Sequence, residues 1–368
     1  MATSVPDYSG GGLVNLVAEL EARLAGSAPS PTLDPSLASR IPDADTYVLV
    51  LFDGLGDDQL EHPAARPLST ARAGALDAPF ASTTTVSLAT VATGLPPLRH
   101  GVIGHLLWLP EVGSVVNTLK WVDLGGHPVA YPTSDLLPSP NLWERLADAG
   151  VEAVTVQPEG FADTPLTSAL YRGCRFEGYG TIEEAVEATV LAARRPRRLV
   201  FTYFPEVDFA AHVWGRRSGE YAQALSGATR AWLDIATRVS PGVVVCGTAD
   251  HGMIDYPDDA KMIVRDPWVR ELTLYGDPRA VYAKGDEESI ERLATLTGAK
   301  TLWGEDAEPL WGDGDPHHLF EERRPDAVLL APPGRLILPP GFDKRLVGYH
   351  GGLEPAERMV PLLVTPTG

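Results

Sequence analysis

The stretch YVLVLFDGLG (residues 47–56) decides the fold class. Six consecutive apolar residues end abruptly at Asp53 and Gly54. A short unbroken run of this kind is typical of a strand buried on both faces of a parallel sheet. The alternation of such runs with helical patterns predicts an α/β fold with a mostly parallel central sheet and helices on both faces. The later strand candidates are VEAVTVQ (151–157), RLVFTYFPEVD (198–208) and GVVVCGTADHG (242–252).

Helical patterns lie before and between these strands. Apolar residues recur with one-faced helical spacing over residues 13–24, and a second pattern covers 139–150. Thr181 and Glu184 have the spacing of a capping box at a helix start. A further helix is predicted over roughly residues 218–239, directly before the last apolar run.

The composition changes between residues 255 and 345, which predicts an inserted subdomain. This segment is rich in charge, Pro and Gly, and it holds one strand–helix pattern (279–298) and one further strand candidate (326–334). The sequence then returns to an apolar strand pattern near its end. We therefore expect a catalytic α/β core made of residues 1–254 and 346–368, and a small α/β insertion made of residues 255–345.

Charge and cysteine content exclude several classes of protein. The 368-residue chain has a formal net charge of -19, so it has no electrostatic footprint for duplex nucleic acid or an anionic membrane. Binding of phosphate would need local positive charge, such as metal ions. Two cysteines, Cys174 and Cys246, imply no disulfide scaffold. Neither a signal peptide nor a membrane span is predicted, so we expect a cytoplasmic protein, and its oligomeric state stays open.

Aspartates end three of the strand candidates. Asp53, Asp208 and Asp250 each follow an apolar run. Ligands of open α/β sheets bind beyond the carboxyl ends of the strands, where these side chains would meet. Three carboxylates would repel one another there unless a cation lay among them. Taken singly, each aspartate could instead have a purely structural role, such as an Asp-Gly turn or a surface ion pair.

Histidines accompany these aspartates. His212 follows Asp208 by one helical turn, and His251 follows Asp250 directly. His350 lies in the glycine-rich stretch GYHGG. Nitrogen and carboxylate ligands without thiolates suit zinc, manganese or iron. Six ligands would serve two divalent ions, a pairing that is used for phosphoryl transfer.

Hydroxyl side chains crowd the stretch PFASTTTVSLATVATGL (79–95). Ser82, Thr83, Thr84 and Thr85 are consecutive, Ser87 follows closely, and an apolar stretch begins at once. One interpretation is a helix N-terminus whose backbone N–H groups are capped by hydroxyls. The other is a nucleophilic hydroxyl, held where a helix N-terminus favours an anion. Both interpretations can hold together.

Together, these segments resemble the type I phosphodiesterase/nucleotide pyrophosphatase family of the alkaline phosphatase superfamily. The resemblance runs from about Tyr47 to Val364, apart from the insertion. Separated motifs carry it as a set, since none is specific alone. They are VLVLFDGLG, STTTVSLATVATGLPPLRHGVIGH, PEVDFAAHVWG, TADHGMID and YHGG.

The resemblance implies an alkaline-phosphatase-like fold and a hydrolase of phosphodiesters or pyrophosphates with a small phosphate-ester substrate. Counting back from Thr93 of the Thr-Gly-Leu motif places the nucleophile at Thr84, which would form a covalent phospho-threonine. One zinc would be held by Asp208, His212 and His350. The other would be held by Asp53, Asp250 and His251, with the Thr84 oxygen completing it.

Two positions depart from the family's pattern. The aromatic residue that usually follows the nucleophile and stacks on a nucleobase is Thr85 here, which questions a nucleotide preference. An asparagine that usually donates to the phosphoryl oxygen is replaced by His105, which could donate instead or could be an ordinary loop histidine. Trp108 and Trp121 are candidates for an apolar wall beside the substrate.

Other functions stay open on the same residues. A phosphomonoesterase or phosphonate hydrolase could use the same two-metal site, although no arginine occurs between Asp77 and Leu98 to hold an exposed phosphate. A phosphomutase is less favoured. A non-catalytic phospholigand-binding protein would not need Thr84. A sulfatase is disfavoured because the Cys/Ser-x-Pro-x-Arg motif is absent.

Overall fold

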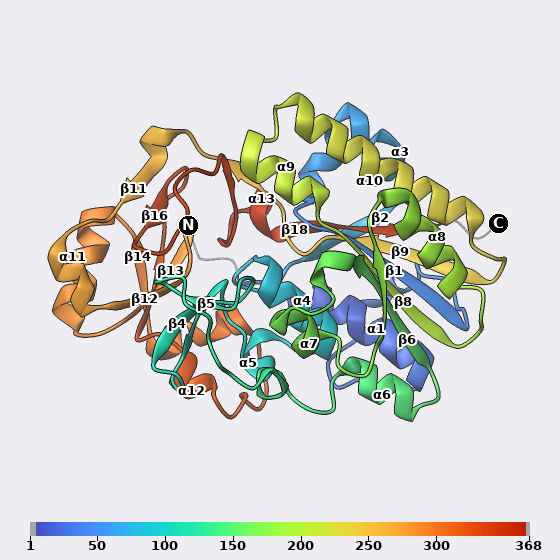
Figure 1. Ribbon diagram of the computed structural model, residues 1–368, viewed down its shortest axis with the longest axis horizontal. Coiled ribbons are helices and arrows are strands. Elements are labelled where there is room, and N and C mark those ends of the chain that lie inside the picture. Colours follow the sequence, from blue (N-terminus) through green and yellow to red (C-terminus); the bar gives the residue numbers. More distant parts are fainter. Residues whose placement is uncertain (1–4, 366–368) are drawn as a thin grey trace.

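The computed structural model describes residues 5–365, so the outermost residues of the predicted core, 1–4 and 366–368, lie outside the described part. Figure 1 shows a larger lobe built around a central sheet and a smaller lobe that contains a second sheet. Each sheet has seven strands within the described residues. The larger lobe carries the predicted α/β fold.

The central sheet is mostly parallel, as predicted. β1 pairs in parallel with β8 and β9, and β6 pairs in parallel with β7 and β8, whereas β18 is antiparallel to β2 and β9. Every residue of β1 and of β8 is buried, in agreement with their unbroken apolar sequences. The order across the sheet is β2 (Arg72–Asp77), β18 (Met359–Val364), β9 (Val243–Thr248), β1 (Thr46–Phe52), β8 (Arg198–Phe204), β6 (Glu152–Pro158) and β7 (Arg175–Tyr179).

Helices cover both faces of this sheet (Figure 1). The predicted helices at 13–24 and 218–239 are confirmed within one residue as α1 and α10, and Thr181 and Glu184 form the predicted capping box. One face carries α1 (Leu13–Ala25), α4 (Thr84–Thr93), α6 (Leu142–Asp148) and α7 (Pro165–Leu170). The other carries α3 (Arg66–Thr70), α8 (Ile182–Ala192), α9 (Glu206–Trp214) and α10 (Gly219–Arg238).

The second sheet is antiparallel and joins two distant parts of the sequence. Its order is β14 (Lys300–Trp303), β15 (Ala327–Leu330), β13 (Ala280–Lys284), β12 (Thr273–Asp277), β3 (Leu106–Leu109), β4 (Ser114–Asn117) and β5 (Val122–Asp123). The predicted insertion begins at residue 255, but the structure pairs its β12 with β3 of the predicted core. The smaller lobe therefore also includes residues 106–123.

The remaining α-helices and two strand pairs complete the two lobes. They are α2 (Pro35–Ala38), α5 (Pro97–His100), α11 (Glu287–Thr297), α12 (Phe320–Arg323), α13 (Pro355–Arg358), and the strand pairs β10 (Ile254–Asp255) with β17 (Gly348–Tyr349) and β11 (Lys261–Ile263) with β16 (Leu336–Leu338).

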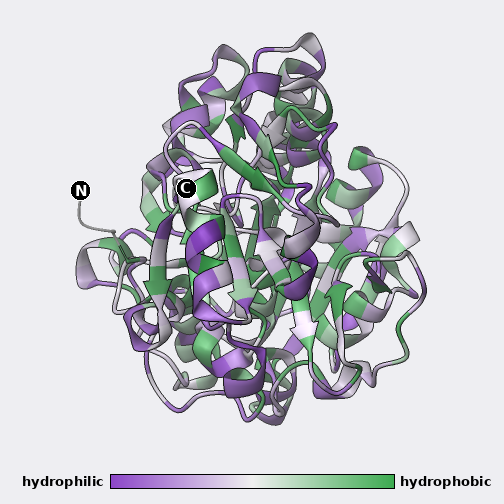
Figure 2. Cartoon of the chain, turned by 90° about the vertical axis from the view of Figure 1, so that its left-hand side faces the viewer, coloured by the Kyte–Doolittle hydropathy of each residue, from purple (hydrophilic) through white to green (hydrophobic). Residues whose placement is uncertain are grey.

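The hydrophobic residues lie mainly on interior strands, whereas the outer helices and loops are largely hydrophilic (Figure 2). Cys246 lies in β9 and is fully buried, as its apolar surroundings in the sequence indicate. Among the helices of residues 5–365, none has both the length and the apolar character needed to cross a membrane.

Candidate active site

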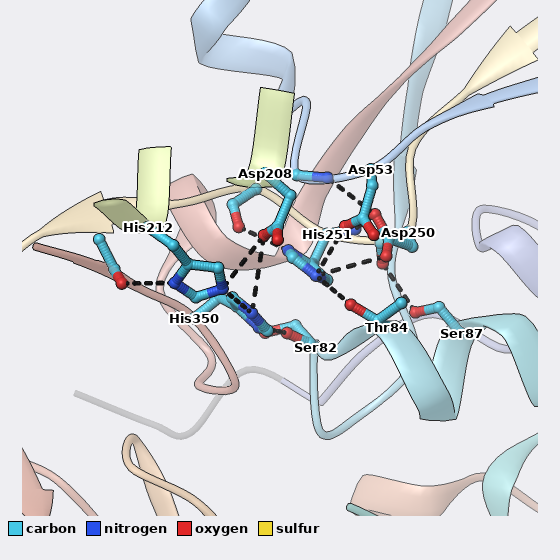
Figure 3. A network of polar contacts seen from close by, with 12 residues as sticks. Asp53, Ser82, Thr84, Ser87, Asp208, His212, Asp250, His251 and His350 are labelled. Atoms are coloured by element: carbon cyan, nitrogen blue, oxygen red, sulfur yellow. Dashed lines mark hydrogen bonds and ion pairs between the residues drawn. The ribbon is translucent and has the colours of Figure 1, made fainter. Parts of the chain in front are cut away.

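The six predicted metal ligands meet at the carboxyl ends of central strands. Asp53 follows β1, Asp208 lies in the first turn of α9 after β8, and Asp250 follows β9 with His251. These residues, with His212 of α9 and with His350 after β17, form one group that we call the ligand cluster (Figure 3).

Gly54 permits this close approach. Its φ of +73° lies in the left-handed region, and a side chain there would place its Cβ 2.8 Å from the Cα of Asp208. The backbone N–H of Asp208 donates to the carbonyl of Asp53 at 3.0 Å, so the ends of β1 and β8 are locked together. The Asp53-Gly54 pair therefore forms the turn and also allows the carboxylates of Asp53 and Asp208 to lie close together.

The two ring nitrogens have the same roles in all three histidines of the ligand cluster. Their Nδ1 atoms face backbone carbonyls, which only accept hydrogen bonds, so each neutral ring carries its proton on Nδ1. The lone pair of each Nε2 then points into the cluster, which is how proteins orient histidine ligands of metals. The Nδ1 pairs are His212 with Gly348 at 2.7 Å, His251 with Gly252 at 2.8 Å and His350 with Ser82 at 2.9 Å.

One oxygen of each aspartate in the cluster is buried without a hydrogen-bond partner. These atoms are Asp53 Oδ1, Asp208 Oδ1 and Asp250 Oδ2. A buried carboxylate oxygen without a partner is costly, so such atoms call for an explanation such as an ion. Each also faces an Nε2 atom, at 3.4 Å for Asp53 and 3.3 Å for Asp250, both to His251, and at 3.3 Å for Asp208 to His212.

The donor set and its spacing fit divalent metal ions. The Nε2 atoms of His212 and His350 lie 3.2 Å apart. Two nitrogens bound ~2.0–2.1 Å from one tetrahedral ion would be about 3.3 Å apart. Two triplets have their ligand atoms within 4.8 Å of one another, namely Asp208 with His212 and His350, and Asp53 with Asp208 and His251. Asp208 belongs to both, so it lies between two candidate ion positions.

The electrostatics of the cluster also call for positive charge. Burial raises the pKa of Asp53 well above its ordinary value, and the neighbouring Asp250 and Asp208 raise it further. Burial likewise raises the pKa of Asp208, against the opposing effect of His212. Burial and the neighbouring His251 and His212 lower the pKa of His350 well below its ordinary value. Metal ions would favour the ionised carboxylates and the neutral imidazole together.

Tyr203 of β8 orients one of these carboxylates, and the sequence reasoning missed it. Its hydroxyl donates a hydrogen bond to Oδ2 of Asp53. This leaves Oδ1 as the atom that faces the cluster. Tyr203 belongs to no recognisable motif, because it is one of the seven buried residues of β8. Loss of a side chain that orients a metal ligand typically costs about 10- to 100-fold in metal affinity or activity.

The hydroxyl row at the start of α4 connects this helix to other segments, and its N-cap side chain does not cap the helix. Thr83 is at the N-cap position, and its side chain makes no capping hydrogen bond, so the capping interpretation is wrong for this residue. Its hydroxyl bonds to Asp277 of β12. Each of the other hydroxyls reaches a different loop: Ser82 donates to the Gly352 carbonyl, Thr85 to the Gly104 carbonyl and Ser87 to the Asp250 carbonyl.

Thr84 is the hydroxyl that faces the ligand cluster. It is the first residue of α4, and its Oγ1 lies 3.2 Å from Nε2 of His251 (Figure 3). Because Nδ1 of His251 carries the proton, the Thr84 hydroxyl is the donor to Nε2. The structure therefore places Thr84, the predicted nucleophile, at the cluster.

Asp277 joins the smaller lobe to the site, and it was not predicted. Its Oδ2 accepts the backbone N–H of His105 at 3.2 Å, and it bonds to the hydroxyl of Thr83. Gly351, next to His350, has a φ of +109°, and a Cβ there would lie 2.5 Å from the Cβ of Asp277. One buried carboxyl thus packs against three segments that border the cluster.

The raised pKa of Asp277 should make the free energy of unfolding depend on pH. An unfolded aspartate ionises near pH 4, whereas burial raises the pKa of folded Asp277 to about 7. As the pH rises from about 4 to 7, the unfolded state ionises first, so the folded state loses stability, and the loss ends near pH 7. Relative to the wild type, Asp277→Asn should gain free energy of unfolding across this window, by up to about 4 kcal/mol at ~1.4 kcal/mol per pH unit.

Urea denaturation of both proteins between pH 4.5 and 7.5, in the presence of a chelator, measures this difference. A difference in the free energy of unfolding that does not change with pH would contradict it. Asp266→Asn, an exposed aspartate of the same lobe, is the matched control.

Trp108 and Trp121 were predicted as candidates for an apolar wall beside the substrate, and Trp121 is too buried for this role. It is 6 % exposed and packs against Tyr131, with ring centroids 6.2 Å apart. Trp108 of β3 is half-buried. His105 lies directly before β3, and its ring interacts electrostatically with His212 and His350, so it borders the ligand cluster.

Known proteins resemble this chain in sequence and in fold. The family model described as type I phosphodiesterase/nucleotide pyrophosphatase matches residues 47–312. A search of curated protein sequences finds no match. Among solved structures, murine ectonucleotide pyrophosphatase/phosphodiesterase 5 is 17% identical, with a TM-score of 0.66 and coverage of 86% of this chain and 87% of that chain.

Two further solved structures contain ligands. An inactive threonine-to-alanine variant of the same murine protein, in complex with AMP, is 18% identical with a TM-score of 0.66, covering 87% of this chain and 88% of that chain. Phosphonoacetate hydrolase from Sinorhizobium meliloti 1021, in complex with phosphonoformate, is 19% identical with a TM-score of 0.65, covering 88% and 91%. At these identities the likeness shows a shared fold.

Proposed function

The chain belongs to the type I phosphodiesterase/nucleotide pyrophosphatase family, and on that premise we propose that it hydrolyses phosphodiester or pyrophosphate bonds with two divalent metal ions and a covalent intermediate on Thr84. The observation that carries the proposal is the convergence of three unpartnered carboxylate oxygens and three Nε2 lone pairs beside the Thr84 hydroxyl.

The residues of the ligand cluster divide between two ion positions. Bound divalent ions would neutralise the charge of a phosphoryl group and lower the pKa of the oxygens they hold. The nitrogen and carboxylate donors favour zinc, and manganese or iron also accept them. Asp208, His212 and His350 would hold one ion. Asp53, Asp250 and His251 would hold the other, together with Thr84, and Asp208 lies within reach of this position as well.

Thr84 performs the first chemical step of the proposed mechanism. The Thr84 hydroxyl gives up its proton, and its Oγ1 forms a bond to phosphorus in line with the leaving oxygen, whose bond to phosphorus breaks and which takes up a proton. Because Oγ1 lies 3.2 Å from Nε2 of His251, this oxygen would be next to the ion that His251 holds, and the N-terminus of α4 favours its anionic form. Water then attacks the phosphorus of the phospho-threonine, the bond to Thr84 breaks, and Thr84 regains a proton. The inactive threonine-to-alanine variant of the murine relative supports a threonine in this role.

The electrostatic balance of the site favours diesters over monoesters. Two divalent ions against three carboxylates give +4 - 3 = +1, and an ionised Thr84 brings this to about zero. A monoester dianion therefore meets little surplus positive charge, and the net charge of -19 opposes it weakly as well. Thr85 donates its hydroxyl hydrogen to the Gly104 carbonyl and offers no aromatic face on which a nucleobase could stack.

We expect kcat/KM for a diester to exceed that for a matched monoester by at least about tenfold, or ~1.4 kcal/mol of transition-state discrimination. Bis-p-nitrophenyl phosphate and p-nitrophenyl phosphate, assayed at one pH and one metal loading, measure the ratio. Equal rates or a monoester preference would favour a phosphomonoesterase on the same site.

A second candidate is a phosphonate hydrolase that uses the same ligand cluster and Thr84. The likeness in fold to the phosphonoacetate hydrolase favours it over a phosphomonoesterase or a non-catalytic phospholigand-binding protein. Release of inorganic phosphate from phosphonoacetate, at a kcat/KM above that for bis-p-nitrophenyl phosphate, would select this candidate. The absence of phosphate release would exclude it.

A further inference from the structure

His105 and Asn117 form a side-chain pair at the border of the ligand cluster. His105 lies directly before β3, and Asn117 is the last residue of β4. The antiparallel β3–β4 pairing fixes their distance, and Thr118 donates to the His105 carbonyl from its backbone N–H at 3.1 Å and from its hydroxyl at 2.8 Å. The side chains meet where Asn117 Nδ2 lies 3.2 Å from His105 Nε2.

The orientation of the Asn117 amide is settled by its other contact. Its Oδ1 accepts the backbone N–H of Lys120 at 3.0 Å, so the nitrogen of the amide is the atom that faces His105. An amide nitrogen only donates, and Nε2 of His105 must therefore accept. The proton of the neutral ring then lies on Nδ1. Burial, with His212 and Lys120 nearby, lowers the pKa of His105 to about 4, which is consistent with a neutral ring at pH 7.

The backbone of His105 is tied to both neighbours of the nucleophile. Asp277 bonds to the His105 backbone N–H and to the Thr83 hydroxyl. The Thr85 hydroxyl donates to the carbonyl of Gly104, directly before His105. His212 contributes to the lowered pKa of His105, and His105 contributes to the lowered pKa of His350, so these rings lie near one another. His105 is therefore held in a fixed relation to Thr84 and to the ligand cluster.

We propose that Asn117 is a positioning residue that fixes His105 as the Nδ1–H tautomer, so that a neutral imidazole presents an N–H donor to an oxygen of the phosphoryl group. The donor role rests on the proposed function, whereas the tautomer rests on the contacts of Asn117 alone. An N–H aimed at a phosphoryl oxygen stabilises the charge that develops there without adding charge to the ground state. A phosphodiester and a phosphonate share this oxygen, so the inference holds for either substrate.

Asn117→Asp tests the inference, because it keeps the shape of the side chain but replaces the donor by an acceptor. A carboxylate opposite Nε2 favours a proton on that nitrogen. ¹⁵N NMR of histidine-labelled protein distinguishes the two tautomers, and His105→Asn identifies the His105 signals. We expect Nδ1–H in the wild type, Nε2–H in Asn117→Asp, and a fall in kcat of roughly 10- to 100-fold with little change in KM or metal content.

Two further variants separate positioning from general damage. Thr118→Val removes a hydroxyl bond to the same carbonyl while the Thr118 backbone N–H keeps its own, so kcat should stay within about twofold. His105→Asn supplies an amide donor that has no tautomer, and in this background Asn117→Asp should lose most of its effect on kcat.

Each outcome decides one part of the proposal. A proton on Nε2 of His105 in the wild type would overturn the assigned tautomer, whatever the activity. A changed tautomer with unchanged kcat would overturn the donor role. If the wild type hydrolysed neither the diester nor the phosphonate, the proposed function would fail, and the NMR result would still decide the tautomer.

Discussion

Thr84→Ala should lower kcat by at least about 10⁴-fold while the fold and the metal content are retained. The substitution removes the attacking oxygen, and loss of a nucleophile has effects of this size in other hydrolases. It removes little packing, because the methyl group of the side chain is the only apolar part lost. Thr84→Ser keeps the hydroxyl and should retain part of the turnover. Steady-state kinetics with bis-p-nitrophenyl phosphate, together with circular dichroism and elemental analysis, measure these effects.

The neighbouring threonines are the matched controls for this prediction. Thr85→Ala loses a long hydrogen bond of 3.4 Å to Gly104, and Thr83→Ala loses the bond to Asp277, but both keep the Thr84 oxygen. We expect measurable turnover from both. If either abolished turnover while Thr84→Ala did not, the nucleophile would be misassigned. Full turnover by Thr84→Ala would favour a mechanism without this residue.

Asp208→Ala should be the most damaging change among the metal ligands. Asp208 belongs to both candidate triplets, so its loss weakens both ion positions, whereas the other ligands serve one position each. We expect about two transition-metal ions per wild-type chain, fewer than one in the variant, and a fall in kcat/KM of at least about a thousandfold, or ~4 kcal/mol. Elemental analysis after mild purification and steady-state kinetics check both numbers.

Asp234→Ala, an exposed aspartate of α10, is the control for the loss of a carboxylate and should change neither metal content nor rate. Dialysis against a chelator should reproduce the loss of activity in the wild type, and added zinc, manganese or iron(II) should restore it. A metal-free protein with full hydrolytic activity would contradict the two-metal account.

The central sheet could be predicted because its strands carry their signal locally. β1, β8 and β9 are apolar runs that end in aspartates, and their burial on both faces needs no other part of the chain to be recognised. The second sheet could not be assembled this way. β3 and β4 are four residues long, and β3 meets β12 through a single bridge between Leu106 and Gly276. Pairing between such distant segments has no local signature.

The ligand cluster was predictable for a related reason. Asp53, Asp208 and Asp250 lie at strand ends, where topology brings side chains together, and the motif order supplied the histidines. Tyr203, Asp277 and Asn117 were missed because each acts only through tertiary contacts. Tyr203 bonds to Asp53, Asp277 to Thr83 and His105, and Asn117 to His105.

The sequence shows that the hydroxyl row is unusual, but it does not show that most of these hydroxyls bond to distant segments. Capping is a local interaction that a sequence suggests directly. In the structure these hydroxyls instead bond to four separate segments, at Gly352, Asp277, Gly104 and Asp250. Such a role depends on which loops lie opposite the start of α4, and only the folded chain shows that.

The stereochemistry of hydrolysis at phosphorus tests the central claim most directly. The substrate is a phosphorothioate diester of known configuration at phosphorus, hydrolysed in ¹⁸O-labelled water by the metal-loaded enzyme. Each in-line displacement inverts the configuration, so attack by Thr84 followed by attack by water gives net retention. The account predicts retention. Net inversion would mean a single displacement by water and would contradict a covalent intermediate on Thr84.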